Sequence, residues 1–156
     1  MSSLDESILQ AVEGLPGISV LVVFGSRARG DNRPDSDLDV AILPKSQDPR
    51  DRRYLRSSIA VALADLAPEG RVDVVFLDEA DDVLRQRVME HGRVLLNRDL
   101  EAWKELRVRT MREYGDREWV RNLYIESQKQ RLERGEPSGR TPRALESLRR
   151  VGKLPR

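Results

Sequence analysis

Apolar residues come in short runs along the first hundred residues, and the spacing within each run predicts its secondary structure. The run 18-ISVLVVF-24 is continuous and rich in β-branched residues, which predicts a buried strand. The apolar residues of 50–67 lie at helical spacing and predict an amphipathic helix. The full expected order is a helix over 4–13, strands over 18–24 and 38–43, a helix over 50–67, a strand over 71–77, a helix over 79–90 and a strand over 93–96. This order indicates an α/β or α+β domain.

The rest of the chain predicts a helical appendix. The pattern from 98 to 134 is mostly helical, and Gly115 is expected to break it. The segment 135-GEPSGRTPR-143 has the composition of a linker and opens a stretch rich in arginine. We therefore predict a first domain over 1–97, a helical extension over 98–134 and a basic, flexible tail over 135–156.

Composition excludes several classes of protein. Of the 156 residues, 38% are hydrophobic and 35% are charged, which is typical of a charge-rich globular protein. The chain contains no cysteine, so a disulfide framework and a thiolate metal site are excluded. Its longest apolar runs are too short to cross a bilayer, and its first residues lack the regions of a secretory signal. We therefore expect a cytoplasmic protein without a membrane span.

The net charge of +1 conceals an asymmetry between the two parts of the chain. Residues 1–97 hold 12 Lys and Arg against 17 Asp and Glu, whereas residues 98–156 hold 16 against 10. The acidic and basic parts could dock on each other, on a partner protein or on a polyanion. The basic tail has no aromatic residues among its arginines, so a solvated or partner-bound tail is favoured over direct nucleic-acid binding.

Two carboxylates open the second expected strand in 24-FGSRARGDNRPDSDLDVAIL-43. Asp37 and Asp39 are separated by one residue, so on a strand their side chains point to the same face with Cα atoms roughly 6.5 Å apart. Carboxylates at this spacing can hold a pair of divalent cations about 3.5–4 Å apart, as in two-metal phosphoryl transfer. Leu38 and Val40 alternate with them and are left for the core. The pair is therefore a candidate catalytic metal site.

Asp73 is the candidate for a third ligand. It interrupts the apolar run 71-RVDVVFL-77, where a lone Asp is disfavoured and a buried, unpaired charge is costly. A metal ion beside this carboxylate would remove the cost. An ion pair with an arginine is the alternative, and the presence of Asp37 and Asp39 favours the metal.

The loop between the first two strands carries groups suited to a triphosphate. Gly25 permits close approach of a phosphate to the backbone, and the hydroxyl of Ser26 supplies another donor. Arg27 and Arg29 add positive charge for the phosphates. An ordinary polar loop would explain the turn residues that follow, but it would not explain the two aspartates. We therefore predict that the loop binds the phosphates and that the aspartates bind the metal ions that neutralise them.

This stretch resembles the signature of the DNA polymerase beta-type nucleotidyltransferase superfamily: Gly25-Ser26, ten intervening residues, then Asp37-x-Asp39. The longer string GSRARGDNRPDSDLDV resembles the smallest members, the minimal nucleotidyltransferases or MNT proteins. The resemblance implies the nucleotidyltransferase fold, a small mixed β-sheet flanked by helices. It also implies Asp37, Asp39 and Asp73 as the catalytic and metal-binding triad, with Gly25 and Ser26 on the nucleotide phosphates.

The resemblance further implies an activity and a partner. The family transfers a nucleoside monophosphate from a triphosphate to a hydroxyl and releases pyrophosphate, with two Mg²⁺ ions at the site. MNT proteins are often antitoxins that adenylylate a tyrosine of a HEPN-domain ribonuclease toxin. We therefore expect AMP transfer from ATP to a HEPN partner in a hetero-oligomer, with the helical extension and the basic tail as candidate docking surfaces.

Two other functions are left open by the sequence. The chain could neutralise its toxin by occlusion alone, or it could be a free-standing nucleotidyltransferase for a small molecule such as an aminoglycoside or for an RNA end. The complete set of Gly25, Ser26 and the three aspartates argues against occlusion as the whole account. Replacing Asp37 and Asp39 by Asn discriminates between catalysis and occlusion, and turnover without any partner protein would indicate the free-standing enzyme.

Overall fold

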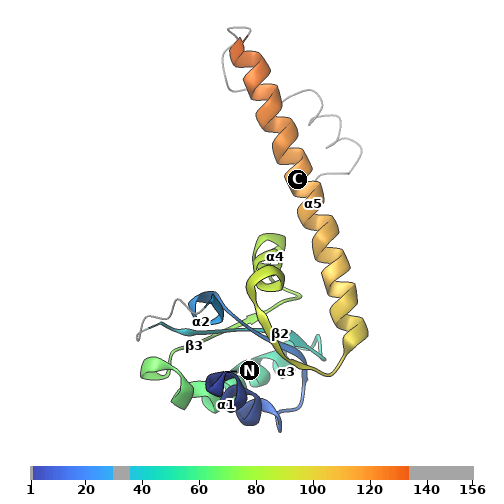
Figure 1. Ribbon diagram of the computed structural model, residues 1–156. Helices are drawn as coiled ribbons and strands as arrows, with labels where there is room; N and C mark the ends of the chain where they lie inside the picture. Colours follow the sequence, from blue (N-terminus) through green and yellow to red (C-terminus); the bar gives the residue numbers. More distant parts are fainter. Residues whose placement is uncertain (1, 30–35, 134–156) are drawn as a thin grey trace. The chain divides into compact units, whose positions relative to one another are not determined.

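The computed structural model describes residues 2–29 and 36–133 (Figure 1). The chain divides into two compact units, Met1–Met111 and Arg112–Arg156. The first unit contains the whole β-sheet and the helices that cover it, and the described part of the second is helical. The predicted tail over 135–156 lies outside the described residues, and the boundaries predicted after residues 97 and 134 stay predictions.

Four strands form a mixed sheet in the order β3-β2-β1-β4. The strand β1 (Ile18–Phe24) pairs antiparallel with both β2 (Leu38–Pro44) and β4 (Arg93–Asn97), while β3 (Val72–Phe76) pairs parallel with β2. Nearly every residue of β1 and β2 is buried, because helices cover both faces of the sheet. The predicted fold class, a small mixed sheet flanked by helices, is confirmed.

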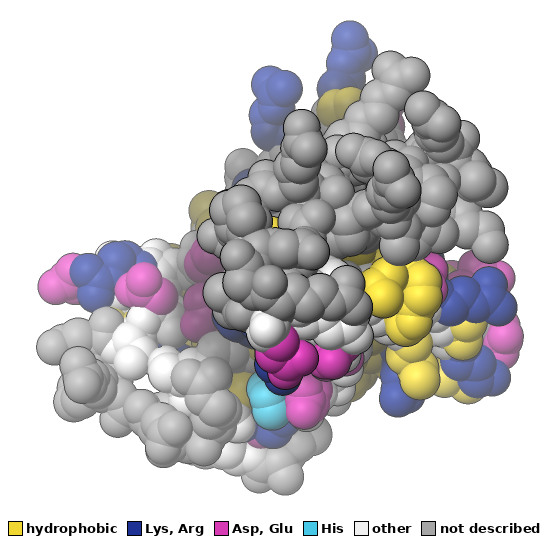
Figure 2. Space-filling view, turned by 90° about the horizontal axis from the view of Figure 1, so that it is seen from above, with side chains coloured by type: hydrophobic (Ala, Val, Ile, Leu, Met, Phe, Trp, Pro, Cys, Tyr) yellow, Lys and Arg dark blue, Asp and Glu magenta, His cyan; other side chains and the backbone are white. Residues whose placement is uncertain are grey.

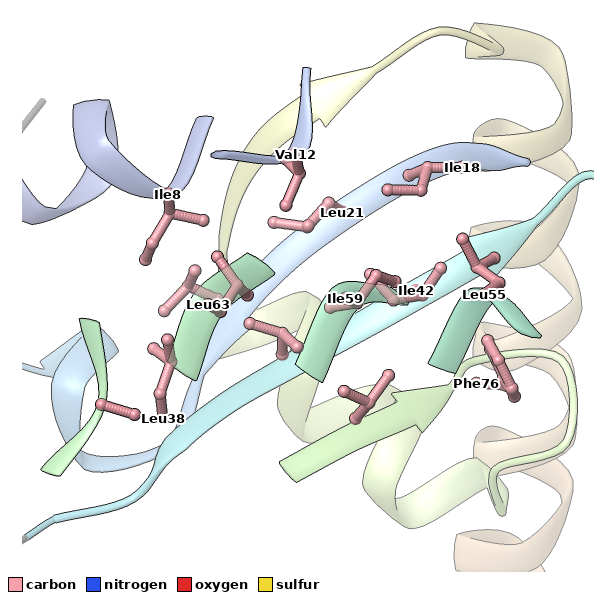
Figure 3. Close-up of a cluster of buried hydrophobic side chains, with 14 residues drawn as sticks. Ile8, Val12, Ile18, Leu21, Leu38, Ile42, Leu55, Ile59, Leu63 and Phe76 are labelled. Carbon is pink, nitrogen blue, oxygen red and sulfur yellow. The ribbon is translucent and has the colours of Figure 1, made fainter. Parts of the chain in front are cut away.

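One face of the sheet is covered by α1 (Ser3–Val12) and α3 (Pro49–Leu63). The apolar sides of these helices pack on the strands, and burying each large aliphatic side chain contributes about 1.5–3 kcal/mol. Figure 3 shows this main core, whose fully buried members include Ile8, Val12, Ile18, Leu21, Ile42, Ile59 and Leu63. An apolar core therefore covers the sheet on this side.

The opposite face of the sheet is covered by α4 (Asp82–His91) and by the first turns of α5 (Leu100–Glu133). Trp103 and Leu106 of α5 are buried in a second apolar cluster that also contains Val88 of α4. The beginning of the predicted helical extension is therefore part of the core of the first unit.

Several helices begin at side-chain caps. Ser2 and Asp5 form a capping box at the start of α1, in which each side chain accepts a hydrogen bond from the other's backbone N–H. Asp48 caps α3 and Asp81 caps α4, each by accepting a hydrogen bond from a backbone N–H of the first turn. The cap at Asp81 explains why α4 begins at Asp82, later than the apolar pattern predicted.

The helix α5 runs through Gly115 without a break, so the prediction that this glycine interrupts it was wrong. A glycine inside a helix costs only about 1 kcal/mol relative to alanine, and the neighbouring residues include the strong helix formers Met111 and Arg112. No helix in the described part of the chain is long and apolar enough to cross a membrane. On the face drawn in Figure 2, acidic and basic side chains lie next to one another, as the high charged fraction of the sequence leads one to expect.

Candidate active site

The Gly-Ser segment folds as one short helix directly after β1. This helix, α2 (Gly25–Arg29), begins where β1 ends, because Gly25 adopts a positive φ of 75° that turns the chain out of the strand. The antiparallel pairing of β1 with β2 places Phe24 opposite Asp39. The helix α2 therefore lies at the end of the sheet where β2 begins (Figure 1), and Asp39 is the second residue of β2. The turn residues at 30–35 are outside the described ranges.

The carboxylate of Asp39 lies directly against Gly25. A Cβ atom placed on Gly25 would be 1.9 Å from Oδ2 of Asp39 and 2.8 Å from its Cγ. Only glycine leaves this space free, so the identity of residue 25 decides where the carboxylate can lie. From the sequence, we expected a glycine at position 25 because a phosphate must approach the backbone there. The structure adds a second reason for a glycine, which is the position of the Asp39 carboxylate.

Two of the three predicted metal ligands come from adjacent strands, and the third directly precedes one of them. Asp39 of β2 is in register with Asp73 of β3, and Asp37 precedes β2 by one position. Residues in register on neighbouring strands point to the same face of a sheet, as do residues two apart on one strand. Asp37 and Asp73 are exposed and Asp39 is half-buried, so the three carboxylates share a face that solvent can reach.

The fit of this group to a divalent cation follows from its donor atoms and its spacing. Carboxylate oxygens are hard ligands of the kind that Mg²⁺ prefers. Within residues 2–29 and 36–133, no three acidic, histidine or cysteine side chains already stand close enough together to form a complete metal site. The register of Asp39 with Asp73 brings two carboxylates to adjacent positions on one face of the sheet. The residues present fit Mg²⁺ on these grounds.

The exposure of Asp73 corrects one step of the sequence argument. A buried charge was expected there because the residue interrupts an apolar run, but β3 is at the edge of the sheet and the carboxylate of Asp73 faces solvent. Avoiding an unpaired buried charge is therefore no reason for a metal at this position. The register with Asp39 is the observation that supports its role as a ligand.

Arg71 is a residue of the site that the sequence argument missed. Its Nε lies 2.7 Å from Oδ1 of Asp37, and its Nη1 lies 3.0 Å from Oε2 of Glu69. Both Glu69 and Gly70 adopt positive φ, of 53° and 69°, and this tight turn delivers Arg71 to the start of β3. The backbone carbonyl of Arg71 accepts a hydrogen bond from the N–H of Leu38 at 3.1 Å, so the guanidinium is held beside the aspartates.

Arg27 makes contacts that the sequence did not predict. Its Nε donates a hydrogen bond to the carbonyl of Ser36 at 3.2 Å, and its Nη1 donates to the carbonyl of Leu66 at 3.1 Å. These bonds tie α2 to the start of β2 and to the end of the segment after α3. Phosphate binding by Arg27 and Arg29 stays a prediction, and Arg27 has a structural role in addition.

The family follows from a match over most of the first unit. Residues 6–101, more than half of the chain, match the family described as polymerase beta, nucleotidyltransferase. The chain belongs to the polymerase beta nucleotidyltransferase family. This confirms the resemblance carried by Gly25-Ser26 and by Asp37-x-Asp39, while the roles of these individual residues stay predictions. No curated protein sequence matches the chain significantly.

Several solved structures are similar to this nucleotidyltransferase. A toxin–antitoxin structure with AMP-PNP has 26% identity and a TM-score of 0.60, and the match covers 80% of this chain and 98% of that chain. A mutant of the toxin–antitoxin MntA–HpeT has 26% identity and a TM-score of 0.57, covering 80% and 97%. A tri-AMPylated Shewanella oneidensis HEPN toxin in complex with MNT antitoxin has 24% identity and a TM-score of 0.54, covering 81% and 96%, and shows a common fold.

Proposed function

We propose that this nucleotidyltransferase transfers AMP from ATP to a hydroxyl group of a HEPN-domain partner, and that the acceptor is a tyrosine. The observation that carries the proposal is the contact of Asp39 with Gly25 together with the register of Asp39 with Asp73. This arrangement joins the Gly-Ser segment and the carboxylates into one site.

The proposed partner and substrate are supported by the similar structures. One of them is a toxin–antitoxin pair with AMP-PNP, an ATP analogue, and another of the same fold contains an AMPylated HEPN toxin with an MNT antitoxin. The match covers nearly the whole of those chains, so no large substrate-binding domain is present in them that this chain lacks. A partner protein that brings its own hydroxyl to the site agrees with the small size of those chains.

Each part of the proposed reaction is assigned to particular residues of the chain. Asp37, Asp39 and Asp73 would hold Mg²⁺, which when bound lowers the pKa of the acceptor hydroxyl and neutralises the triphosphate. The backbone of Gly25 and the hydroxyl of Ser26 would donate to the phosphates. The hydroxyl oxygen forms a bond to the α-phosphorus, the bond from this phosphorus to the bridging oxygen breaks, and pyrophosphate leaves. Asp73, which is exposed beside the site, would accept the hydroxyl proton.

The proposal is tested by the intact mass of a HEPN partner after incubation with this protein, ATP and Mg²⁺. The wild type should add one AMP group or a multiple, and Asp37→Asn/Asp39→Asn should add none. A matched control is Asp65→Asn, which removes the charge of another exposed carboxylate in the turn after α3 and should leave AMP transfer unchanged.

Two other results would contradict the proposal. A partner that the wild type leaves unmodified, and whose ribonuclease activity the wild type and the double variant suppress equally, would indicate occlusion. Turnover of ATP on a small hydroxyl compound or an RNA end, without modification of the partner, would indicate a free-standing nucleotidyltransferase.

A further inference from the structure

Arg93 connects three segments of the chain that are far apart in sequence. It is the first residue of β4, and its Nη1 donates hydrogen bonds to the carbonyls of Ala28 at 2.6 Å and Arg27 at 3.3 Å. Its Nη2 donates to Oδ1 of Asp5 at 2.8 Å. One guanidinium thus lies between α1 and the C-terminal end of α2.

Asp5 is a fixed anion rather than a mobile surface carboxylate. Its side chain is only 4% exposed, and its second oxygen accepts a hydrogen bond from the N–H of Ser2 at 3.0 Å in the capping box. Burial by itself raises the pKa of Asp5, but the hydrogen bonds from Ser2 and Arg93 outweigh burial and hold the pKa below its ordinary value. Asp5 is therefore ionised at neutral pH and fixes the direction in which Arg93 points.

The helix α2 needs such external support. It has five residues, and an isolated helix of this length is not stable in water. Its last carbonyls have no partner within the helix, and the guanidinium of Arg93 supplies donors to two of them. The side chain of Arg27 holds the same helix from another side through the carbonyls of Ser36 and Leu66.

We propose that Arg93, anchored by Asp5, is a positioning residue for nucleotide binding. By holding the C-terminal carbonyls of α2, it sets the orientation of the whole helix and hence of Gly25 and Ser26 at its other end. This inference rests on the proposed function, because it assumes that these two residues contact the phosphates of ATP. A positioning role and a merely stabilising role make different predictions. If Arg93 positions α2, its loss must weaken nucleotide binding by more than the accompanying loss of folding stability explains.

Arg98 provides a matched control. It lies just beyond the other end of β4, and its guanidinium also donates to two backbone carbonyls, those of Leu15, at 2.9 Å, and Glu13. Arg93→Gln and Arg98→Gln therefore remove the same kind of bond at the two ends of β4. Only Arg93 touches α2.

Two measurements on the full chain test the proposal. The first is hydrogen exchange of the backbone amides of residues 26–29 without nucleotide, and the second is the equilibrium affinity for a fluorescent, non-hydrolysable ATP analogue in the presence of Mg²⁺. Arg93→Gln should speed exchange in 26–29 and weaken the affinity about tenfold to a hundredfold, because the charge-assisted hydrogen bonds that hold the C-terminal end of α2 are lost. Arg98→Gln should leave both unchanged.

Two further variants keep the test independent of a folding failure in Arg93→Gln. Arg93→Lys should recover part of the affinity, because one ammonium group can replace only part of the fork that bonds α2 and Asp5 together. Asp5→Asn should weaken the affinity for the ATP analogue less than Arg93→Gln does. The double variant Asp5→Asn/Arg93→Gln should bind the analogue as weakly as Arg93→Gln alone, because Asp5 acts through Arg93.

The outcomes separate this inference from the proposed function. Unchanged affinity in Arg93→Gln, or an equal loss in Arg98→Gln, would overturn the positioning role of Arg93. Unchanged exchange of residues 26–29 in Arg93→Gln would overturn it as well, whether or not nucleotide binds. A third outcome is that the wild-type chain binds no ATP analogue, although Arg93→Gln still speeds exchange of residues 26–29. This outcome would overturn the proposed function and, with it, the role of Arg93 in nucleotide binding.

Discussion

Replacing Gly25 by alanine should slow AMP transfer roughly a hundredfold while leaving the protein folded. The added Cβ would lie 1.9 Å from Oδ2 of Asp39, whereas contacts of real Cβ atoms are essentially never shorter than 3.0 Å. The carboxylate oxygen must therefore move by about 1 Å or more, and a displacement of this size in a reacting site costs roughly a hundredfold in rate. The positive φ of 75° adds about 1–2 kcal/mol of backbone strain, which is small against a typical domain stability of about 5–15 kcal/mol.

Gly17→Ala is the matched control for this experiment. Gly17 has a similar positive φ of 87°, but the nearest atom to its added Cβ is a methyl carbon of Leu55 at 3.7 Å, an ordinary contact. Both variants should lose a similar free energy of unfolding in urea, and only Gly25→Ala should lose AMP transfer in a single-turnover assay. Activity of Gly25→Ala within a few-fold of the wild type would refute the claim that the contact between Gly25 and Asp39 sets the site, as would an equal loss in Gly17→Ala.

Three further outcomes follow from individual contacts. Arg71→Gln should tighten binding of Mn²⁺ by at most about fivefold, because the half-exposed ion pair of Arg71 with Asp37 contributes no more than about 1 kcal/mol. Mn²⁺ replaces Mg²⁺ in this experiment because its binding can be followed by paramagnetic resonance. Weaker binding of Mn²⁺ would contradict this expectation. Arg52→Met should lower the free energy of unfolding by about 3–5 kcal/mol, since the buried guanidinium pairs with Asp78, and should leave AMP transfer intact. The stability contributed by Asp5, whose pKa is depressed, is present at neutral pH and is lost as pH falls below its ordinary value of 3.8. The difference in unfolding free energy between wild type and Asp5→Asn should therefore shrink on acidification, and a difference independent of pH would contradict the ion pair.

The local parts of the site could be predicted from the sequence. The alternation of Asp37 and Asp39 with buried residues places both carboxylates on one face of any strand, and Gly25 and Ser26 follow a run that is apolar enough to be a central strand. The two central strands were predicted for the same reason, since continuous apolar runs mark strands that are covered on both faces.

Other parts depend on which segments meet, and sequence spacing does not contain that information. The contact of Asp39 with Gly25 requires the antiparallel register of β1 with β2. Arg93 reaches α2 from the edge strand β4, far along the chain. Asp73 was expected to be buried because the sequence of a strand does not say whether it lies at the centre or at the edge of a sheet. Gly115 was expected to end a helix because the sequence shows the low helix propensity of glycine. It does not show that the helix on either side of Gly115 is stable enough to continue through it.

The most direct test of the central claim follows the phosphorus atoms of ATP. Wild-type protein is incubated with a HEPN partner, Mg²⁺ and ATP that carries radioactive phosphorus at either the α or the γ position. Label from the α position should become covalently attached to the partner and label from the γ position should not, with neither transferred by Asp37→Asn/Asp39→Asn. Attachment of γ-label would mean phosphoryl rather than nucleotidyl transfer, and attachment of neither label to a stably bound partner would contradict catalysis at this site.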